Sequence, residues 1–283
     1  MIIAYTSDLH IDVSDRNREA ARIVAAAVAE RCPDLFVLAG DAGNTLDDLR
    51  FVLEVFADTA IAKLFVPGNH DVWIETRDGE LLDSRSKWER FIPELCREMG
   101  FHDLGREPVI MGDLGFVGSL GWYDYSFADP RLNLDEDAYW AGRYGNEIWW
   151  DKKMTYWPPA QAAGRRLRDP EVCAEMARRL DADISSIEPD VERIVAVVHT
   201  LPFLVGLPRS EPPYYLDAYT GSDQLGRTLA AHPKTTHCIG GHKHLSGDWD
   251  AAGIRIHRRV LGRIDEGVDI ETAARGAFGV LDI

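Results

Sequence analysis

The chain has 283 residues, of which 46% are hydrophobic, and carries a formal net charge of −16 with a pI near 4.9. This length and hydrophobic content suffice to bury a full core, so one domain over residues 1–283 with loop insertions is the economical prediction. The acidic charge and the lack of a basic run argue against extended nucleic acid as a partner, because such binding draws on many contacts from Lys and Arg to phosphates.

Membrane insertion and secretion are not expected either. No segment approaches the ~18 continuous apolar residues of a membrane span, and the amino terminus lacks the basic region of a signal peptide. The cysteines are widely spaced and form no CxxC motif, which favours free, buried thiols at Cys32, Cys96, Cys173 and Cys238. We therefore expect a cytoplasmic protein with no membrane partner, and its oligomeric state is left open.

Short apolar runs predict buried strands in chain order. They lie at residues 2–6, 35–39, 64–67, 194–198 and 236–239. Apolar residues at helical spacing predict helices over 18–31 and 45–57, and Asp169-Pro170-Glu171 is a start signal for another helix. A further helix is expected over 84–99, where Pro93 should kink or split it.

Later strands are predicted without long helical patterns between them, which suggests hairpins. They lie at residues 108–111, 115–118, 254–258 and 278–281. Taken with the alternation of strands and helices in the first part of the chain, this order is typical of a layered α/β protein.

An aromatic-rich insertion at about residues 121–160 interrupts this pattern. It contains Trp122, Tyr123, Tyr125, Phe127, Tyr139, Trp140, Tyr144, Trp149, Trp150, Tyr156 and Trp157. We expect a cap or lid region with two alternative roles for its rings. One or two could stack on a flat group of a substrate, or the cluster could be the small core that keeps a long insertion ordered.

Each of the first-named buried strands is followed directly by a polar cluster. The clusters are Asp8-Leu9-His10, Gly40-Asp41, Gly68-Asn69-His70-Asp71, His199 and Gly241-His242-Lys243-His244. Ligands of layered α/β proteins bind at the carboxyl ends of the strands, so these clusters should meet in one polar crevice. In extended backbone, side chains two positions apart point to the same face. Asp8 and His10 should therefore converge, as should His242 and His244.

The donor types in these clusters indicate metal chemistry. Oxygen and imidazole donors without a thiolate suit manganese, iron or zinc in a hydrolytic centre and exclude a Cys-rich structural zinc site. An isolated His such as His199 is as often a structural group as a metal ligand. The metal interpretation is strong only because all five clusters occur together. His102, His232, His237 and His257 lie outside every cluster and are expected to be structural.

The motifs DxH, GDxx, GNHD, a lone His after a strand, and GHxH occur here in this order, and they resemble those of the calcineurin-like metallophosphoesterase superfamily. The resemblance covers roughly residues 1–260. It implies a four-layer α/β/β/α sandwich of two mixed sheets flanked by helices, with a dinuclear metal site at the carboxyl edge of the strands. The four later strands would then fit the second sheet.

The resemblance also implies roles for individual residues. One metal ion would be held by Asp8, His10, Asp41 and His244, and the other by Asp41, Asn69, His199 and His242, with Asp41 as the bridge. The two divalent or trivalent ions, manganese first with iron or zinc as alternatives, would generate a metal-bound hydroxide that attacks phosphorus in line. His70 would protonate the leaving oxygen or stabilise the transition state, while Asp71 orients its ring.

The expected activity is therefore hydrolysis of a small phosphodiester or phosphomonoester, with nucleotides among the candidates. A DNA or RNA nuclease of the same superfamily is the alternative within the enzymes, and a basic groove would favour it. A protein phosphatase is a third option. A non-catalytic scaffold with this fold is the alternative outside the enzymes, although no expected ligand is missing from the sequence.

Overall fold

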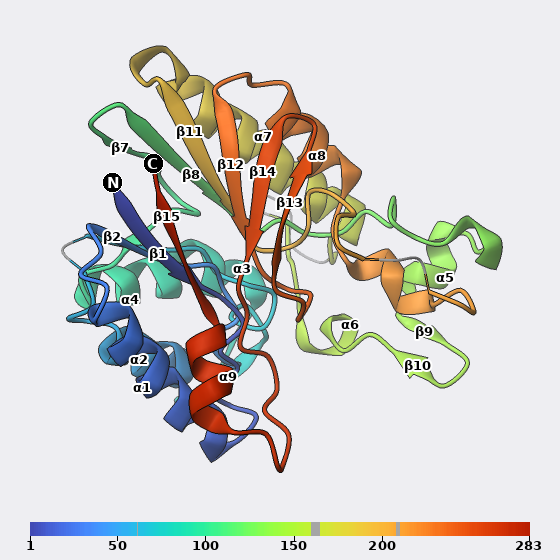
Figure 1. Cartoon of the computed structure of the whole chain (residues 1–283). Helices are drawn as coiled ribbons and strands as arrows, with labels where there is room; N and C mark the ends of the chain where they lie inside the picture. The colour runs from blue at the N-terminus through green and yellow to red at the C-terminus, as the bar shows by residue number, and fades with distance from the viewer. Residues whose placement is uncertain (61, 160–164, 208–209) are drawn as a thin grey trace.

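The computed structural model describes residues 1–60, 62–159, 165–207 and 210–283. Two β-sheets pack face to face, and helices cover the outer face of each sheet (Figure 1). The predicted α/β sandwich of two mixed sheets flanked by helices is confirmed. That the chain forms a single domain stays a prediction.

The first sheet has four parallel strands and one antiparallel edge strand. In spatial order these are β15 (Phe278–Asp282), β1 (Ile2–Thr6), β2 (Leu35–Leu38), β3 (Ala62–Phe65) and β6 (His102–Asp103). The prediction that residues 278–281 belong to the second sheet is wrong, because β15 pairs with β1 and places Gly279 opposite Tyr5. A Cβ at Gly279 would lie 2.3 Å from the Tyr5 ring, so a glycine is needed for this pairing.

The second sheet is parallel at its centre and has a hairpin at each edge. Its order is β13 (Gly247–Ala251), β14 (Ile254–Arg258), β12 (Thr235–Gly240), β11 (Arg193–Val198), β8 (Leu114–Ser119) and β7 (Val109–Met111). The antiparallel pair β7–β8 is the hairpin expected from residues 108–111 and 115–118, whereas β14 forms its hairpin with β13, a strand that the sequence did not predict. The strands of 194–198 and 236–239 therefore lie in a different sheet from the first three.

Alternating side chains divide the core into separate layers. Along β1, Ile3 and Tyr5 belong to the layer between the two sheets, while Ala4 belongs to the layer under the helices. The layer between the sheets also buries Leu35, Val37, Leu64, Phe116, Val195, Val197 and Ile239. Because strand side chains alternate between two faces, both faces of each largely parallel sheet are covered, as such sheets require.

The helices begin where the sequence has capping residues. On the first sheet lie α1 (Asp15–Ala29), α2 (Leu46–Val55), α4 (Ile92–Glu98) and α9 (Ile270–Gly276), and on the second α7 (Asp169–Ile187) and α8 (Asp223–Ala230). Ser14 caps α1, and Thr45 forms a capping box with Asp48 at α2. Pro93 does not split the helix predicted over 84–99: helical backbone continues from α3 (Ser84–Ser86) through a π-helical turn (Lys87–Phe91) into α4, and Pro93 lies in the first turn of α4.

The aromatic insertion forms short elements beside the sandwich (Figure 1). They are a 3₁₀ turn (Pro130–Leu132), α5 (Glu136–Trp140), β9 (Arg143–Tyr144), β10 (Glu147–Ile148) and α6 (Asp151–Met154). Six of its rings are buried, namely Trp122, Tyr123, Tyr125, Phe127, Tyr139 and Trp157. Most of the cluster is therefore the small core of the insertion, whose predicted end at residue 160 lies outside the described residues.

Other short elements lie in the segments that connect these helices and strands. They are the hairpin of β4 (Glu75–Arg77) and β5 (Glu80–Leu82) and two 3₁₀ turns, Glu188–Asp190 and Tyr215–Tyr219. The second of these turns follows His199 along the chain and packs Tyr219 against the insertion, with its ring stacked on Trp149 at 5.0 Å.

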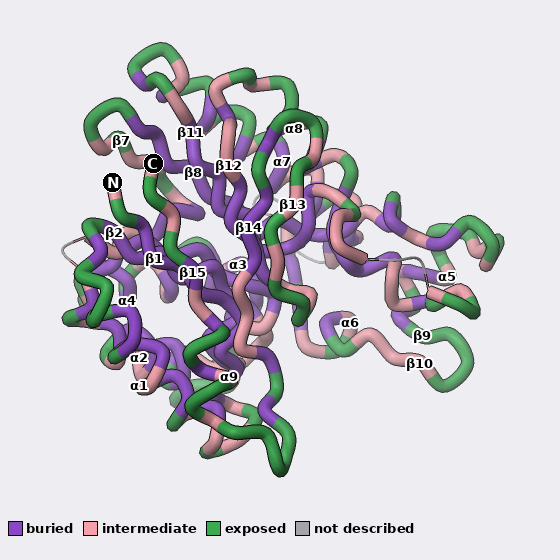
Figure 2. The backbone as a smooth tube through the Cα atoms, in the orientation of Figure 1, coloured by how far each residue is buried: buried purple, intermediate pink, exposed green. Residues whose placement is uncertain are grey.

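Burial follows the layered arrangement: the central strands of both sheets are buried, whereas the edge strands β13 and β15 and many connecting turns are partly or fully exposed (Figure 2). Three cysteines are buried as expected, Cys96, Cys173 and Cys238, whereas Cys32 is exposed after the end of α1. The expectation of a buried thiol is wrong there because the chain turns away from the helix, with Cys32 in a left-handed conformation (φ 48°). Among the described residues, no helix is both long and apolar enough to cross a membrane.

Candidate dinuclear metal centre

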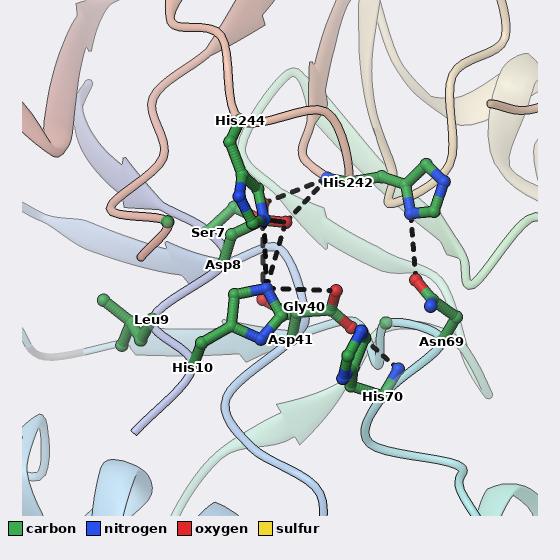
Figure 3. A network of polar contacts seen from close by, with 12 residues as sticks. Ser7, Asp8, Leu9, His10, Gly40, Asp41, Asn69, His70, His242 and His244 are labelled. Carbon is green, nitrogen blue, oxygen red and sulfur yellow. Dashed lines mark hydrogen bonds and ion pairs between the residues drawn. The ribbon is translucent and has the colours of Figure 1, made fainter. Parts of the chain in front are cut away.

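The predicted metal ligands come together where the two sheets meet. Asp8, Asp41 and Asn69 follow the carboxyl ends of β1, β2 and β3 in the first sheet, and His199 and His242 follow β11 and β12 in the second. Figure 3 shows His10, His244 and Asp8 pointing toward one another, while the Leu9 side chain between two of them points away. The crevice expected from the sequence is therefore built from both sheets.

Donor atoms of these residues lie close enough to share a metal ion. The candidate groups are Asp8 with His10 and His244, Asp41 with His199 and His242, and His10 with Asp41 and His70, and within each group the donor atoms lie within 4.8 Å of one another. We call Asp8, His10, Asp41 and His244 the first ligand group, and Asp41, Asn69, His199 and His242 the second.

The backbone at this site adopts a conformation that L-residues rarely take. Asp8, His10, Asp41 and His242 have φ values of 55°, 43°, 55° and 68°, in the left-handed region. The extended backbone expected for Asp8 and His10 is therefore not observed, although their side chains do converge. Strained residues of this kind cost about 1–3 kcal/mol each and cluster at functional sites.

Two glycines allow the loops to approach one another. Gly40 has φ 93°, and a Cβ there would lie 2.5 Å from the Gly68 nitrogen. A Cβ at Gly68 would lie 2.2 Å from Oδ1 of Asp41. Both positions therefore need glycine because of close contacts beside the ligands.

In the second ligand group, each of the two histidines donates one hydrogen bond to a backbone carbonyl, and its other ring nitrogen faces the site. His199 uses Nδ1 to donate to the Ala39 carbonyl at 2.7 Å, and His242 uses Nε2 to donate to the Tyr219 carbonyl at 2.9 Å. A neutral imidazole has one N–H, so His199 Nε2 and His242 Nδ1 are left as acceptors. They lie 3.2 Å and 2.9 Å from Oδ1 of Asn69, which is itself an acceptor.

Acceptors in contact with one another require a positive charge between them. Oδ2 of Asp41 adds a further acceptor, 3.3 Å from Nε2 of His199. Without a metal ion, an additional proton on His199 provides this charge. Burial alone lowers the pKa of His199, but the neighbouring Asp41 raises it overall to about 10. The donors present fit a metal cation, which would displace that proton on binding.

The first ligand group has the same character. Nε2 of His10 lies 3.1 Å from Nε2 of His244, and Oδ1 of Asp8 lies 3.4 Å from the latter atom. Oδ2 of Asp41 lies 3.6 Å from Nε2 of His10, so the same carboxylate oxygen borders both groups, as a bridging ligand must. Burial alone raises the pKa of Asp41, but His199 and His70 hold it well below its usual value.

The contacts of His70 and Asp71 differ from the prediction. Asp71 does not orient the His70 ring, because its carboxylate accepts the backbone N–H groups of Asp41, Ala42 and Gly68 at 2.8, 3.0 and 2.7 Å. Asn44 takes the expected place instead, with Oδ1 2.9 Å from Nδ1 of His70. Asp71 therefore holds together the two loops that carry Asp41 and Asn69.

The imidazole of His70 is neutral and lies at the edge of the site. Asn44 donates through Nδ2 to Asp12 at 2.7 Å, which fixes its oxygen toward His70 and makes Nδ1 of His70 the protonated nitrogen. Burial lowers the pKa of His70 to about 4, and its ring stacks on Trp73 with centroids 4.1 Å apart. To donate a proton from Nε2, this ring must first take up a second proton.

A cavity of about 320 Å³ opens over the two ligand groups. Besides predicted ligands and His70, it is lined by Val13, Trp149 and Arg263. Trp149 is thus the ring of the insertion that borders the site. Reasoning from the sequence missed Val13, Arg263, Asn44 and the buried Asp151, because each lies outside the motifs and only the folded chain brings it to the site.

The four histidines outside the motifs take no part in the site. His232 pairs with Glu188 and Asp181, and His257 pairs with Asp248. None of the four belongs to a candidate metal group among the described residues.

Two mixed sheets between helices, with clustered His and Asp at the strand ends, define a metallophosphoesterase fold. The sequence model of the calcineurin-like phosphoesterases matches residues 1–246, and the chain belongs to this family. Members of the family are typically metal-dependent hydrolases with a dinuclear metal site.

Among characterised proteins, the chain is similar to the [acyl-carrier-protein] phosphodiesterase PptH of Mycobacterium tuberculosis. The two are 29% identical over 104 residues, which is 35% of this chain and 32% of that protein. The matched stretch thus spans about a third of the relative's length.

Solved structures share the fold over most of the chain. The phosphopantetheinyl hydrolase PptH of M. tuberculosis superposes with a TM-score of 0.70 at 19% identity, covering 92% of this chain and 89% of that one. A dimetal phosphatase of Danio rerio gives a TM-score of 0.53 at 12% identity, covering 92% and 87%. At these identities the likeness concerns the fold alone.

Proposed function

We propose that the chain is a dinuclear-metal-dependent hydrolase of a small phosphate ester, with a phosphodiester as the preferred substrate. One observation carries the proposal: acceptor atoms of the second ligand group face one another with their own protons already donated elsewhere. Such a group binds a cation, and Asp41 joins it to the first ligand group. Two bound ions would supply Lewis-acid chemistry and lower the pKa of a water molecule.

The chain's own residues would bind and orient the ester in the cavity. Arg263 is the one Lys or Arg among the described residues that line the cavity, and one guanidinium matches the single charge of a diester better than the double charge of a monoester. Val13 and Trp149 provide an apolar wall for one of the two ester substituents. The M. tuberculosis relative is named as a phosphodiesterase, which supports the same preference.

The site favours neither a nuclease nor a non-catalytic scaffold. A nuclease would need a groove with many cations along it, and the described residues that line the cavity include one. A scaffold would be expected to have lost ligands, whereas every residue expected as a ligand is present in the sequence, and close approaches between their donor atoms support the metal site.

The first test is hydrolysis of bis(p-nitrophenyl) phosphate and p-nitrophenyl phosphate by metal-stripped protein. We expect turnover to return when Mn²⁺, Zn²⁺ or Mg²⁺ is added, with a higher kcat/KM for the diester. A higher kcat/KM for the monoester would contradict the preferred substrate. No turnover by protein that binds two ions, with either ester or with a phosphopantetheinylated acyl carrier protein, would contradict the enzymatic function.

A second test concerns His70. The substitution His70→Ala should lower kcat by about 10²-fold or more, because a positioned acid contributes about 10²–10⁴-fold, while both ions remain bound. The matched control is His232→Ala, which removes a half-buried His that pairs with two carboxylates and precedes β12, whose opposite end leads to His242. Unchanged kcat in the His70 variant would rule out its catalytic role.

A further inference from the structure

A buried carboxylate from the aromatic insertion contacts a predicted metal ligand. Asp151, at the start of α6, is 1% exposed. It accepts hydrogen bonds from Nδ2 of Asn69 at 3.1 Å to each of its oxygens, from Nε1 of Trp73 at 2.7 Å, and from the Tyr123 hydroxyl at 3.2 Å. Three side chains thus donate to this carboxylate, and one of them is the amide of Asn69.

This contact determines which atom of Asn69 faces the metal site. An Asn side chain can rotate by half a turn, which exchanges its oxygen with its NH₂ group. In the rotated position, the NH₂ group would donate to His199 and His242 and occupy the place of the cation. Asp151 opposes that rotation because it accepts from Nδ2, which keeps Oδ1 directed at the two imidazoles.

We propose that Asp151 is a positioning residue that keeps the Asn69 oxygen facing the second ligand group. The proposal rests on the proposed function, since it takes Asn69 as a metal ligand. Partners that orient ligands commonly change metal affinity or activity by about 10–100-fold when they are replaced. The insertion thus contributes to the metal site through a residue that binds no metal itself.

The same carboxylate also connects the site to the wall of the cavity. Nε1 of Trp149 donates to the Tyr123 hydroxyl at 3.0 Å, and that hydroxyl donates to Asp151. The Trp149 ring lies edge-on to His242, with centroids 5.9 Å apart. A single buried group therefore fixes both a ligand and the aromatic residue beside the substrate space.

The decisive variant is Asp151→Asn, which keeps the size of the side chain and replaces one of the two oxygens that accept from Nδ2 of Asn69 with an NH₂ group that cannot accept. We expect isothermal titration of the metal-stripped full chain with Mn²⁺ to show two sites in the wild type. In the variant, one site should persist and the other should weaken by about 10–100-fold. Electron paramagnetic resonance should change from the spectrum of a coupled pair to that of isolated Mn²⁺.

A double variant provides the rescue. This double variant combines Asn69→Asp with Asp151→Asn. The carboxylate at 69 presents an oxygen to the metal site in either rotated position. The amide at 151 can donate to that carboxylate while it still accepts from Trp73. We expect the second Mn²⁺ to bind again. Failure of this folded variant to regain the second ion would overturn the proposal, and it can be examined even where Asp151→Asn alone does not fold.

The matched control is Asp169→Asn, a second buried carboxylate that holds the insertion. Asp169 pairs with Trp122, Tyr125 and Lys152, none of which is a predicted ligand. Two Mn²⁺ ions should bind to this variant as in the wild type, and loss of the second site here would show that general loosening of the insertion suffices. If Asp151→Asn binds two Mn²⁺ ions as tightly as the wild type does, this inference alone is overturned. If the wild type binds fewer than two Mn²⁺ ions, the proposed function is overturned as well.

Discussion

Replacing Asp41 by Asn should abolish binding of both metal ions while the chain stays folded. The new NH₂ group would lie where Oδ2 now faces His10 and His199, at 3.6 and 3.3 Å, and would donate to their free nitrogens. Oδ1 would still accept from the His70 backbone N–H at 2.9 Å. We expect kcat/KM to fall by at least about 10³-fold, because metal ions supply several kcal/mol to the transition state.

The matched control for this variant is Asp103→Asn. Asp103 is also a buried Asp at the end of a first-sheet strand; it accepts from the Gly105 backbone N–H and belongs to no candidate metal group among the described residues. Burial raises its pKa to about 7, so the neutral amide should be tolerated. Metal content measured by mass spectrometry separates the two variants, and two tightly bound ions in Asp41→Asn would refute the bridging assignment.

Removal of the metal ions should lower the thermal stability of the protein as well as its activity. The ions would join residues that follow strands of both sheets, such as Asp8 and His242, which in the metal-free chain are held by the His242 backbone N–H donating to Asp8 at 3.0 Å. A ligand present at a hundred times its Kd stabilises by about 2.7 kcal/mol. For a chain of this length that corresponds to a Tm lower by about 5–10 °C per ion after chelation.

Calorimetry of chelator-treated and Mn²⁺-restored protein checks this expectation. The Asp41→Asn variant serves as the control, since its Tm should not respond to Mn²⁺ over the same range. An unchanged Tm in the wild type on addition of Mn²⁺ would mean that the left-handed backbone at the site is stable without the ions.

The fold was largely predictable because its strands are continuous apolar runs with polar residues directly after them. The strand of residues 2–6 occurs as predicted, and the helix start at Asp169 also agrees. The sheet to which a strand belongs was not predictable for residues 278–281, because an apolar run does not reveal its neighbour. In the structure this run pairs with residues 2–6, and Gly279 lies opposite Tyr5.

The grouping of the candidate ligands was predictable from motif order, whereas their supporting contacts were not. Asp71 follows His70 in sequence, but its side chain turns toward backbone N–H groups that short-range reasoning cannot place. Asn44 and Asp151 reach the site from distant segments and belong to no recognisable spacing. Contacts of this kind depend on tertiary packing rather than on local pattern.

The exposed Cys32 offers a single point of chemical attachment, because the other three thiols are buried. Cys32 precedes β2, whose opposite end leads to Asp41. A maleimide dye or a surface linker at this thiol would therefore lie at the far end of the strand from the ligands. Immobilised or labelled in this way, the protein would present its cavity to solution, which suits single-molecule or sensor-chip work with candidate esters.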